Sequence, residues 1–223
     1  MSPAFQRQGL HALLLAGLLA GVAALARGPA FSEGGWGGLS TGAWFGLTIA
    51  VPVLHEVYVA FCWRAELHGR HLTRRLGRAA FWLYAALFLS FFAGRAASMA
   101  GLALASRDTL DQNLVWRMLL LGLLGAPVLW SLYSVVRHFG VLRALGRDHF
   151  DPAVRALPPV REGAFRYVPN AMYTLSFAAF WMPGLALGSR PALLAAAFTH
   201  AYIWVHYWCT EKPDLEFMHG TRS

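Results

Sequence analysis

Long apolar segments constrain this 223-residue chain more than any other feature. A helix that crosses a bilayer needs about 20 mostly apolar residues. Only 13% of the residues are charged, against about 25% in an average soluble domain. We therefore expect an all-α integral membrane protein of about six transmembrane helices (five to six), not a soluble enzyme or a nucleic-acid-binding module. The expected spans are 8–26, 41–63, 79–105, 114–136, 171–188 and 191–209.

The spans are expected to form one membrane domain, residues 1–223, in two parts. Residues 1–136 would form an N-terminal four-helix part. Residues 137–223 would supply a basic loop, a hairpin of two helices and a tail. Pro183-Gly184 and Pro191 punctuate the last two spans, which predicts a tight turn between them.

Most Lys and Arg residues lie in the connections on one side of the predicted membrane. This asymmetry predicts the orientation of the protein. Fourteen of the 19 fall on one side, and we assign that side to the cytoplasm. The result is an even number of spans with both termini cytoplasmic, in a bacterial inner membrane or the endoplasmic reticulum. The fourteen are Arg7, Arg64, Arg70, Arg74, Arg75, Arg78, Arg137, Arg143, Arg147, Arg155, Arg161, Arg166, Lys212 and Arg222.

The first apolar segment also has an alternative interpretation. Arg7, the stretch after it and Ala24-Leu25-Ala26 resemble a cleavable signal peptide, whose loss would leave five spans. We favour retention, because the stretch is long for the apolar region of a signal.

Ionisable residues inside the predicted spans are costly and indicate function by default. The ones we single out are His55, Glu56, Arg95, His200 and His206. Helical spacing places His200 and Glu211 on one face, so that this face ends at a carboxylate. The alternative is that these groups only satisfy one another between helices. Residues 55–59 do not complete an HExxH motif, and two cysteines form no CxxC pair, so no metal site is predicted.

The segment from Arg161 to Glu216 carries two recognisable blocks around the last hairpin. It resembles the superfamily of phospholipid methyltransferases and isoprenylcysteine carboxyl methyltransferases, which are integral membrane enzymes. The first block matches that family's pattern at Gly163, Phe165, Arg166, Tyr167, Asn170 and Tyr173, and the second matches at Glu211. The chain departs from the pattern at Pro169, Ala171 and Lys212, so the resemblance carries over the overall arrangement but not the detailed ligand geometry.

This resemblance implies a site for S-adenosyl-L-methionine at the cytoplasmic end of the last hairpin. Arginine suits the carboxylate of that cofactor, a carboxylate suits its ammonium, and aromatic faces attract its sulfonium. The cofactor-binding residues expected on this basis are Gly163, Arg166, Tyr167, Asn170, Tyr173, His200, Tyr207 and Glu211.

We expect the methyl acceptor to be phosphatidylethanolamine or a related aminolipid. Its ammonium must lose a proton before it attacks, and His55, Glu56 or His206 is the expected base. Arg64 or Arg137 would hold the lipid phosphate. Three alternatives stay open: an isoprenylcysteine-type carboxyl methyltransferase, an NADPH-dependent membrane lipid reductase, and a membrane protein that binds haem through histidines. The sequence leaves the oligomeric state open.

Overall fold

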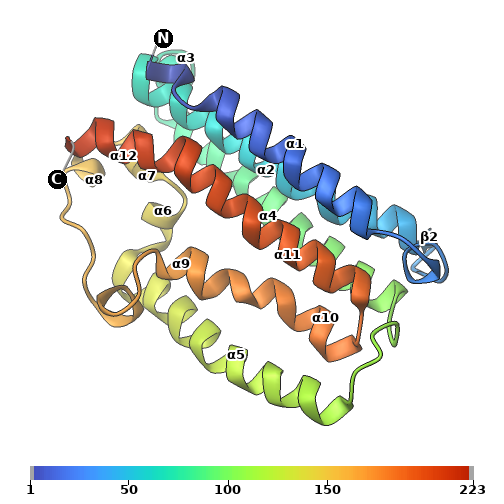
Figure 1. Ribbon diagram of the computed structural model, residues 1–223. Coiled ribbons are helices and arrows are strands. Elements are labelled where there is room, and N and C mark those ends of the chain that lie inside the picture. The colour runs from blue at the N-terminus through green and yellow to red at the C-terminus, as the bar shows by residue number, and fades with distance from the viewer. Residues whose placement is uncertain (1–2, 221–223) are drawn as a thin grey trace.

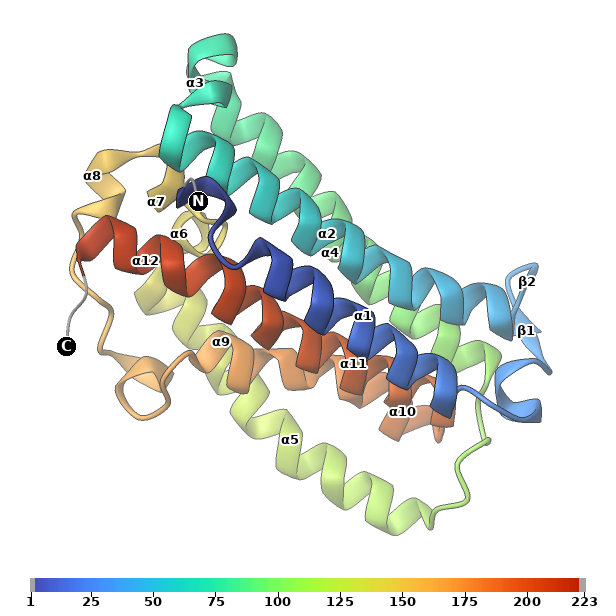
Figure 2. The same cartoon turned by 45° about the horizontal axis from the view of Figure 1, so that its top comes forward.

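The computed structural model describes residues 3–220 and is a bundle of long helices (Figures 1 and 2). The long helices are α1 (Gln8–Leu25), α2 (Thr41–Gly69), α4 (Ala79–Ala105), α5 (Leu114–Ser134) and α11 (Arg190–His206). Serine side chains cap the N-termini of two of these helices. Ser40 accepts from the Ala43 N–H at the start of α2, and Ser189 accepts from the Ala192 N–H at the start of α11.

Short elements connect the long helices. The first connection holds a two-stranded antiparallel hairpin, β1 (Gly35–Trp36) and β2 (Leu39–Ser40). The short helices are α3 (His71–Leu76), α6 (Val141–Ala144), α7 (Arg147–Phe150), α8 (Pro152–Arg155), α9 (Ala171–Thr174), α10 (Met182–Leu187) and α12 (Lys212–His219). Turns of 3₁₀ helix occur at Pro3–Phe5, Pro29–Phe31, Gly163–Arg166 and Ser176–Trp181, and turns of π helix at Val135–Phe139 and Tyr207–Glu211.

Helix α11 occupies the centre of the bundle. It packs against α1, α2, α4 and the segment from α9 to α10 (Figures 1 and 2). Ala192, Ala195 and Ala196 are completely buried along it. Lipid provides no hydrophobic driving force for helices to associate, so close packing matters more. Small residues such as alanine allow helix backbones to approach closely. The last long helix in the sequence is therefore the one on which the others converge.

The all-α membrane fold expected from the sequence is confirmed. Within residues 3–220, four helices are long and apolar enough to cross a membrane: α1, α2, α4 and α5 with its π-helical extension. The fifth apolar segment, Ala171–Leu187, is shorter and is divided into α9, a 3₁₀ stretch and α10. Pro183 and Gly184 were predicted to mark the turn but lie inside α10. The turn follows at Gly188, which ends α10 with a positive φ of 60°, and Ser189, which caps α11.

Helix α2 is longer than the predicted span, which was expected to end at residue 63. It continues to Gly69 because Arg64, Glu66 and Leu67 are buried against the rest of the protein rather than exposed in a loop. Glu66 also caps α3, since its carboxylate accepts from the N–H groups of Leu72 and Thr73 at 3.1 and 2.9 Å.

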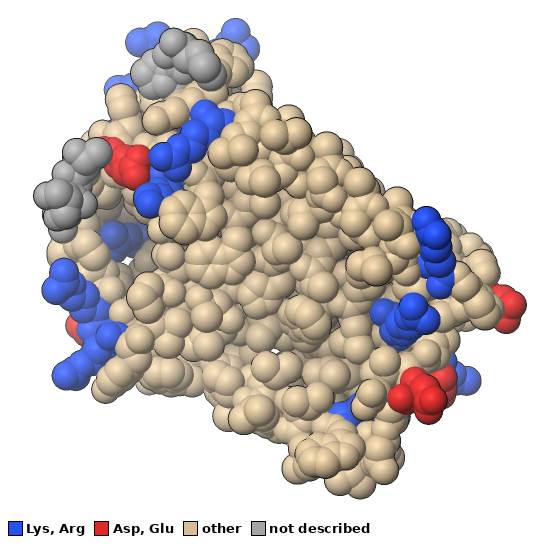
Figure 3. All heavy atoms as spheres, in the orientation of Figure 1, with Lys and Arg blue, Asp and Glu red and all other residues tan. Residues whose placement is uncertain are grey.

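The two described ends of the chain lie at the same end of the bundle (Figures 1 and 2). Arg7 donates to the Trp208 carbonyl at 3.0 Å, and Gln8 donates to the Cys209 carbonyl at 3.3 Å. We call this end, which also holds α3, α7, α8 and α12, the basic end. On the face shown in Figure 3, charged side chains gather at the two ends, and the band between them is largely uncharged. Arg222, counted above among the cytoplasmic residues, lies outside the described residues.

A buried ion pair fixes the C-terminal helix at the basic end. Arg64 Nε of α2 lies 2.6 Å from Asp214 Oδ1 of α12, and both side chains are almost completely buried. Arg64 Nη2 also donates to the carbonyls of Cys209 and Thr210 at 3.2 and 3.1 Å. One side chain therefore ties the second helix of the chain to its final turns, across a sequence separation of about 150 residues.

We predict that Asp214→Asn lowers the stability of the folded protein. Removing one partner of a buried pair leaves the other charge uncompensated and costs roughly 3–5 kcal/mol. The melting temperature in detergent should fall clearly, while Asp111→Asn, at an exposed loop position, should leave it unchanged. Equal melting temperatures for both variants would show that the pair does not stabilise α12.

Candidate active site

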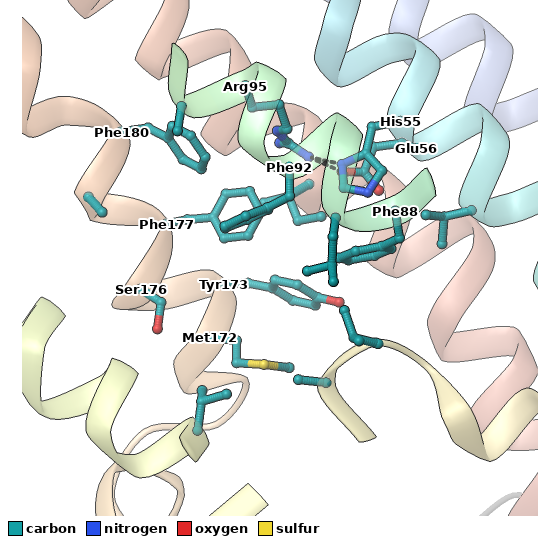
Figure 4. Close-up of a pocket in the computed structure, with 18 of the residues that line it drawn as sticks. His55, Glu56, Phe88, Phe92, Arg95, Met172, Tyr173, Ser176, Phe177 and Phe180 are labelled. Carbon is teal, nitrogen blue, oxygen red and sulfur yellow. Dashed lines mark hydrogen bonds and ion pairs between the residues drawn. The ribbon is translucent and has the colours of Figure 1, made fainter. Parts of the chain in front are cut away.

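A cavity of about 440 Å³ lies inside the bundle (Figure 4). Its lining is mostly apolar and comes from α2, α4, α5, α6, the segment from α9 to α10, and α11. Leu89 and Phe92 of α4 and Leu132 of α5 line it and are also 50%, 42% and 42% exposed. The cavity therefore reaches the apolar surface of the bundle between these two helices.

One wall of the cavity is polar. Arg95 Nη1 of α4 lies 2.5 Å from Glu56 Oε1 and 3.2 Å from His55 Nδ1, both on α2. His206 Nδ1 of α11 lies 3.4 Å from Glu56 Oε2. All four side chains are buried and line the cavity. We call these four residues the Glu56 group. It joins three helices through one carboxylate.

Aromatic rings surround the Glu56 group. His55 packs against Phe88 and Phe91, with ring centroids 4.4 and 5.7 Å away. The Arg95 guanidinium lies 5.2 Å from the ring centroid of Phe177 and 5.5 Å from that of Phe180. Cation–π contacts of this kind stabilise a desolvated cation by up to about 2 kcal/mol. The rings also keep water away from the charges, which strengthens their mutual attraction.

A second polar contact joins the cavity to the basic end. The hydroxyl of Tyr173, on α9 and in the cavity wall, donates to Glu211 Oε2 (Figure 4 shows the Tyr173 side chain). The Tyr173 ring meets those of Trp204 and Tyr207 edge-on, at centroid distances of 6.1 and 6.0 Å. Burial raises the pKa of Glu211 and the Tyr173 hydrogen bond lowers it, with a net rise to about 7. This carboxyl is therefore poised to change its charge near neutral pH.

Glu211 is the last residue of the π-helical turn Tyr207–Glu211. Turns of this kind are rare and often occur at functional sites, because they shift the side chains that follow relative to those before. The carbonyls of Cys209 and Thr210 in this turn accept from Arg64. Two sets of contacts therefore hold Glu211 in place. One is the hydrogen bond from Tyr173, and the other is the pair of hydrogen bonds from Arg64 to the carbonyls just before Glu211.

A buried histidine completes the basic end. His149 Nδ1 of α7 lies 2.9 Å from Asp148 Oδ1, and its Nε2 lies 3.4 Å from Asp214 Oδ2. Its ring stacks on Trp63 with centroids 4.1 Å apart. Burial alone would lower the pKa of His149, but the two carboxylates outweigh it and raise the pKa to about 9. A protonated imidazole therefore ties the basic loop to both α2 and α12.

The loop before α9 is held against the end of α5. Gly163 has a positive φ of 56°, and a Cβ there would lie 2.5 Å from Ser134 Oγ. Ser134 Oγ in turn accepts from the Ala164 N–H at 2.9 Å. Asn170, also with a positive φ, begins α9, and its carbonyl accepts from the Tyr173 N–H at 2.9 Å. Glycine and asparagine are the residues that adopt this backbone conformation most readily.

Comparison with known proteins identifies the C-terminal half of the chain. Residues 116–222 match the sequence model of the phospholipid methyltransferase family. This region is similar to that family. No curated protein and no solved structure shows significant similarity to the chain. The resemblance seen in the sequence is thus confirmed, and together with the apolar helices it indicates a membrane-embedded methyltransferase.

The methyltransferase match includes one side of the cavity and leaves out the other. It begins in α5 and contains Tyr173, His206 and Glu211. Helices α2 and α4 precede it, so His55, Glu56 and Arg95 lie outside the matched residues. The cavity is therefore built jointly by the family region and by the N-terminal helices.

Six of the predicted site residues lie in or beside the cavity. His55, Glu56 and His206, the predicted bases, form one connected group. Tyr173, Tyr207 and Glu211, predicted to bind cofactor, form another. Tyr173 lines the same cavity as the first group, so this residue connects the two sets.

Other residues predicted to bind the cofactor do not lie beside Tyr173 and Glu211. Arg166 and Tyr167 are exposed and contact each other, with the guanidinium 5.6 Å from the ring centroid. His200 accepts from the Trp181 indole at 3.1 Å. It precedes Glu211 by eleven positions, or about 16 Å of helix. The π-helical turn Tyr207–Glu211 also lies between them and shifts the helical register, so helical spacing does not place the two residues in one site.

The two arginines predicted to hold a phosphate differ in their surroundings. Arg64 is buried and engaged with Asp214 and with backbone carbonyls. Its contacts are those of a residue that holds α12 in place. Arg137 is exposed at the end of the α5 extension, at the basic end. Of the two, only Arg137 has a side chain accessible to a ligand in solution or at the membrane surface.

Sequence reasoning missed several residues at the site. Arg95 was seen as an ionisable residue in a span but received no role, although its side chain contacts both His55 and Glu56. His149, Asp148 and Asp214 were not singled out. Asp214 lies far in the sequence from its partners His149 and Arg64, so no local motif marks it. The adjacent Asp148-His149 pair in a loop after two glycine turns was the one available signal.

We predict that the stability of the protein depends on pH through His149. Its pKa rises from about 6.5 in the unfolded chain to about 9 in the fold. The stabilisation is therefore fully present below pH 6.5 and is lost progressively as pH rises to 9. The melting temperature in detergent should fall over this range, and His149→Gln should flatten the fall. Parallel curves for wild type and variant would contradict the assignment.

Proposed function

We propose that this protein transfers a methyl group from S-adenosyl-L-methionine to the amine of phosphatidylethanolamine or a related aminolipid. The observation that carries this proposal is a single cavity with two polar contacts. It borders the Glu56 group at one wall and Tyr173, bonded to Glu211, at another. A membrane phospholipid methyltransferase needs such a space, where a lipid amine and a cytosolic methyl donor meet away from water.

The side chains around Glu211 fit the chemistry of the methyl donor. The Glu211 carboxylate suits its ammonium or its ribose hydroxyls. The edge-on rings of Tyr173, Trp204 and Tyr207 suit a sulfonium. Arg166 is exposed in the loop before α9, outside this cluster, and would have to meet the donor's carboxylate at the outer edge of the site. When bound, the donor would supply an electrophilic methyl group on a positively charged sulfur.

The Glu56 group can prepare the amine. An ammonium must lose a proton before its lone pair can attack. His206 Nδ1 faces Glu56 Oε2 at 3.4 Å, and its Nε2 has no hydrogen-bond partner among the described residues. A proton held on Nδ1 leaves the Nε2 lone pair free to accept the proton of the ammonium, and Glu56 stabilises the imidazolium that forms. We therefore favour His206 as the base and Glu56 as its positioning partner.

The lipid would enter from the membrane between α4 and α5. Leu89, Phe92 and Leu132 form an apolar mouth there, where acyl chains can remain in contact with the bilayer. We propose that the basic end faces the cytoplasm, since 14 of the 19 basic residues were assigned to that side. A cytosolic donor would then approach from the side of Glu211, opposite to the lipid.

Lipid mass spectrometry of cells that express the protein tests this proposal directly. We expect phosphatidylethanolamine to gain one, two or three methyl groups. Purified protein should incorporate label from methyl-labelled donor into lipid. Glu211→Ala and Arg166→Ala should reduce incorporation, with Glu211→Ala lowering it by about 100-fold or more. Glu33→Ala, exposed at the opposite end of the bundle, should be as active as wild type. Full activity in both site variants would overturn the assigned cofactor pocket.

We also predict that binding of the methyl donor weakens in acid. Because the pKa of Glu211 lies at about 7, its carboxyl is mainly neutral at pH 6 and attracts an ammonium poorly. The KM for the donor should rise by up to about tenfold between pH 8 and pH 6. Glu211→Gln should have a raised KM that does not change over this range, as measured with Glu33→Gln beside it as the control. A steep pH dependence retained in Glu211→Gln would exclude Glu211 as the titrating group.

A further inference from the structure

Arg95 has hydrogen-bonding capacity that the fold does not use. It is 2% exposed, and its Nη1 serves both Glu56 and His55. Its Nε and Nη2 are buried and have no hydrogen-bond partner within residues 3–220. The rings of Phe177 and Phe180 lie against the guanidinium and also line the cavity (Figure 4).

Buried arginine N–H groups without hydrogen-bond acceptors lower the stability of the folded protein. A buried polar group without a partner costs about 1–3 kcal/mol, and more when it is charged. The neighbouring aromatic rings offset part of this cost but accept no conventional hydrogen bond. A tetrahedral oxyanion in the cavity would satisfy both donors, because the guanidinium edge matches two oxygens of such an anion. The unused edge is therefore suited to a phosphate diester.

The carboxylate beside Arg95 suits the opposite charge. Glu56 Oε1 contacts Arg95 and Glu56 Oε2 contacts His206, so an ammonium that approaches His206 also approaches this carboxylate. An anion on Arg95 and a cation beside Glu56 would together add no net charge to a buried site. A net anionic headgroup would add a charge that nothing compensates, and such a charge is costly inside a membrane.

We propose that Arg95 is a substrate-binding residue that holds the phosphate of the lipid headgroup through Nε and Nη2, while Glu56 receives its ammonium. The pair thereby selects zwitterionic lipids over anionic or uncharged ones. This inference rests on the proposed function, which it deepens by naming the residues that recognise the headgroup. It also extends the site beyond residues 116–222, into helices α2 and α4.

The arrangement agrees with the order of groups in a lipid. Glu56 contacts Arg95 on one side and His206 on the other, and His206 precedes Glu211 by five positions. The amine would therefore lie between the phosphate and the methyl-donor side of the cavity. Acyl chains would continue from the phosphate towards the mouth at Leu89 and Phe92.

Binding measurements on the full chain in detergent test this inference without reference to catalysis. The probes are short-chain phosphatidylethanolamine, phosphatidylglycerol and diacylglycerol, and the readout is the shift in melting temperature with lipid concentration. Wild type should bind phosphatidylethanolamine more tightly than either other lipid. Arg95→Lys keeps the charge opposite Glu56 but loses the planar edge. It should bind phosphatidylethanolamine about tenfold more weakly and diacylglycerol unchanged.

Two further variants keep the test decisive. Arg117→Lys changes an arginine of α5 that does not line the cavity, and its lipid affinities should equal those of wild type. Combined Glu56→Met and Arg95→Met removes both charges together, a change that buried pairs often tolerate. This protein should fold and bind all three lipids with similar affinity. A remaining preference for phosphatidylethanolamine, or wild-type affinity in Arg95→Lys, would overturn the inference.

The failure of this inference can be told apart from the failure of the proposed function. Methyl transfer by wild type, with lipid binding that does not depend on Arg95, would overturn the inference alone. Lipid binding that depends on Arg95, without methyl transfer from the labelled donor, would support the inference and overturn the proposed reaction.

Discussion

The cost of a charge in the membrane interior governs how this protein is built. Glu56 and Arg95 are buried and meet at 2.5 Å, with histidines from α2 and α11 on either side. Neither charge is stable there without the other, so α2, α4 and α11 must adopt one relative position. The cavity lies beside these contacts and is lined by the Glu56 group and by aromatic rings such as Phe88. At the basic end, a second set of buried charges around Asp214 fixes the relative positions of α2, α7 and α12.

Much of the fold could be predicted from hydropathy alone. Spans 8–26, 79–105 and 114–136 correspond closely to α1, α4 and α5. The errors lie where polar residues are buried by distant partners. The prediction ended α2 at residue 63, because Arg64 and Glu66 look like loop residues until Asp214 and the start of α3 are known. The segment Ala171–Leu187 is divided into α9, a 3₁₀ stretch and α10, and it packs between α5 and α11, a placement that no local pattern reveals.

In the site, as in the fold, the sequence identified residues that belong to local patterns and missed roles that depend on distant partners. Tyr173 and Glu211 were found through a sequence block and its spacing, and the structure joins them by a hydrogen bond. Gly163 was found by the same block, and its positive φ and contact with Ser134 explain why glycine is needed. Arg95 could be seen but not interpreted, because its partners depend on how two helices align. The π-helical turn at Tyr207–Glu211 also shifts the register on which face predictions rely.

The central position of α11 has a consequence for how the protein is made. Ribosomes deliver α1, α2 and α4 to the membrane long before α11 is synthesised. Until it arrives, His11 of α1 lacks Tyr202, to which it hydrogen-bonds at 3.1 Å, and Glu56 lacks His206. The nascent helices must therefore wait in the bilayer as an open, incompletely satisfied assembly. Quality control at the insertion machinery would meet an unfinished bundle in every chain that stops before α11.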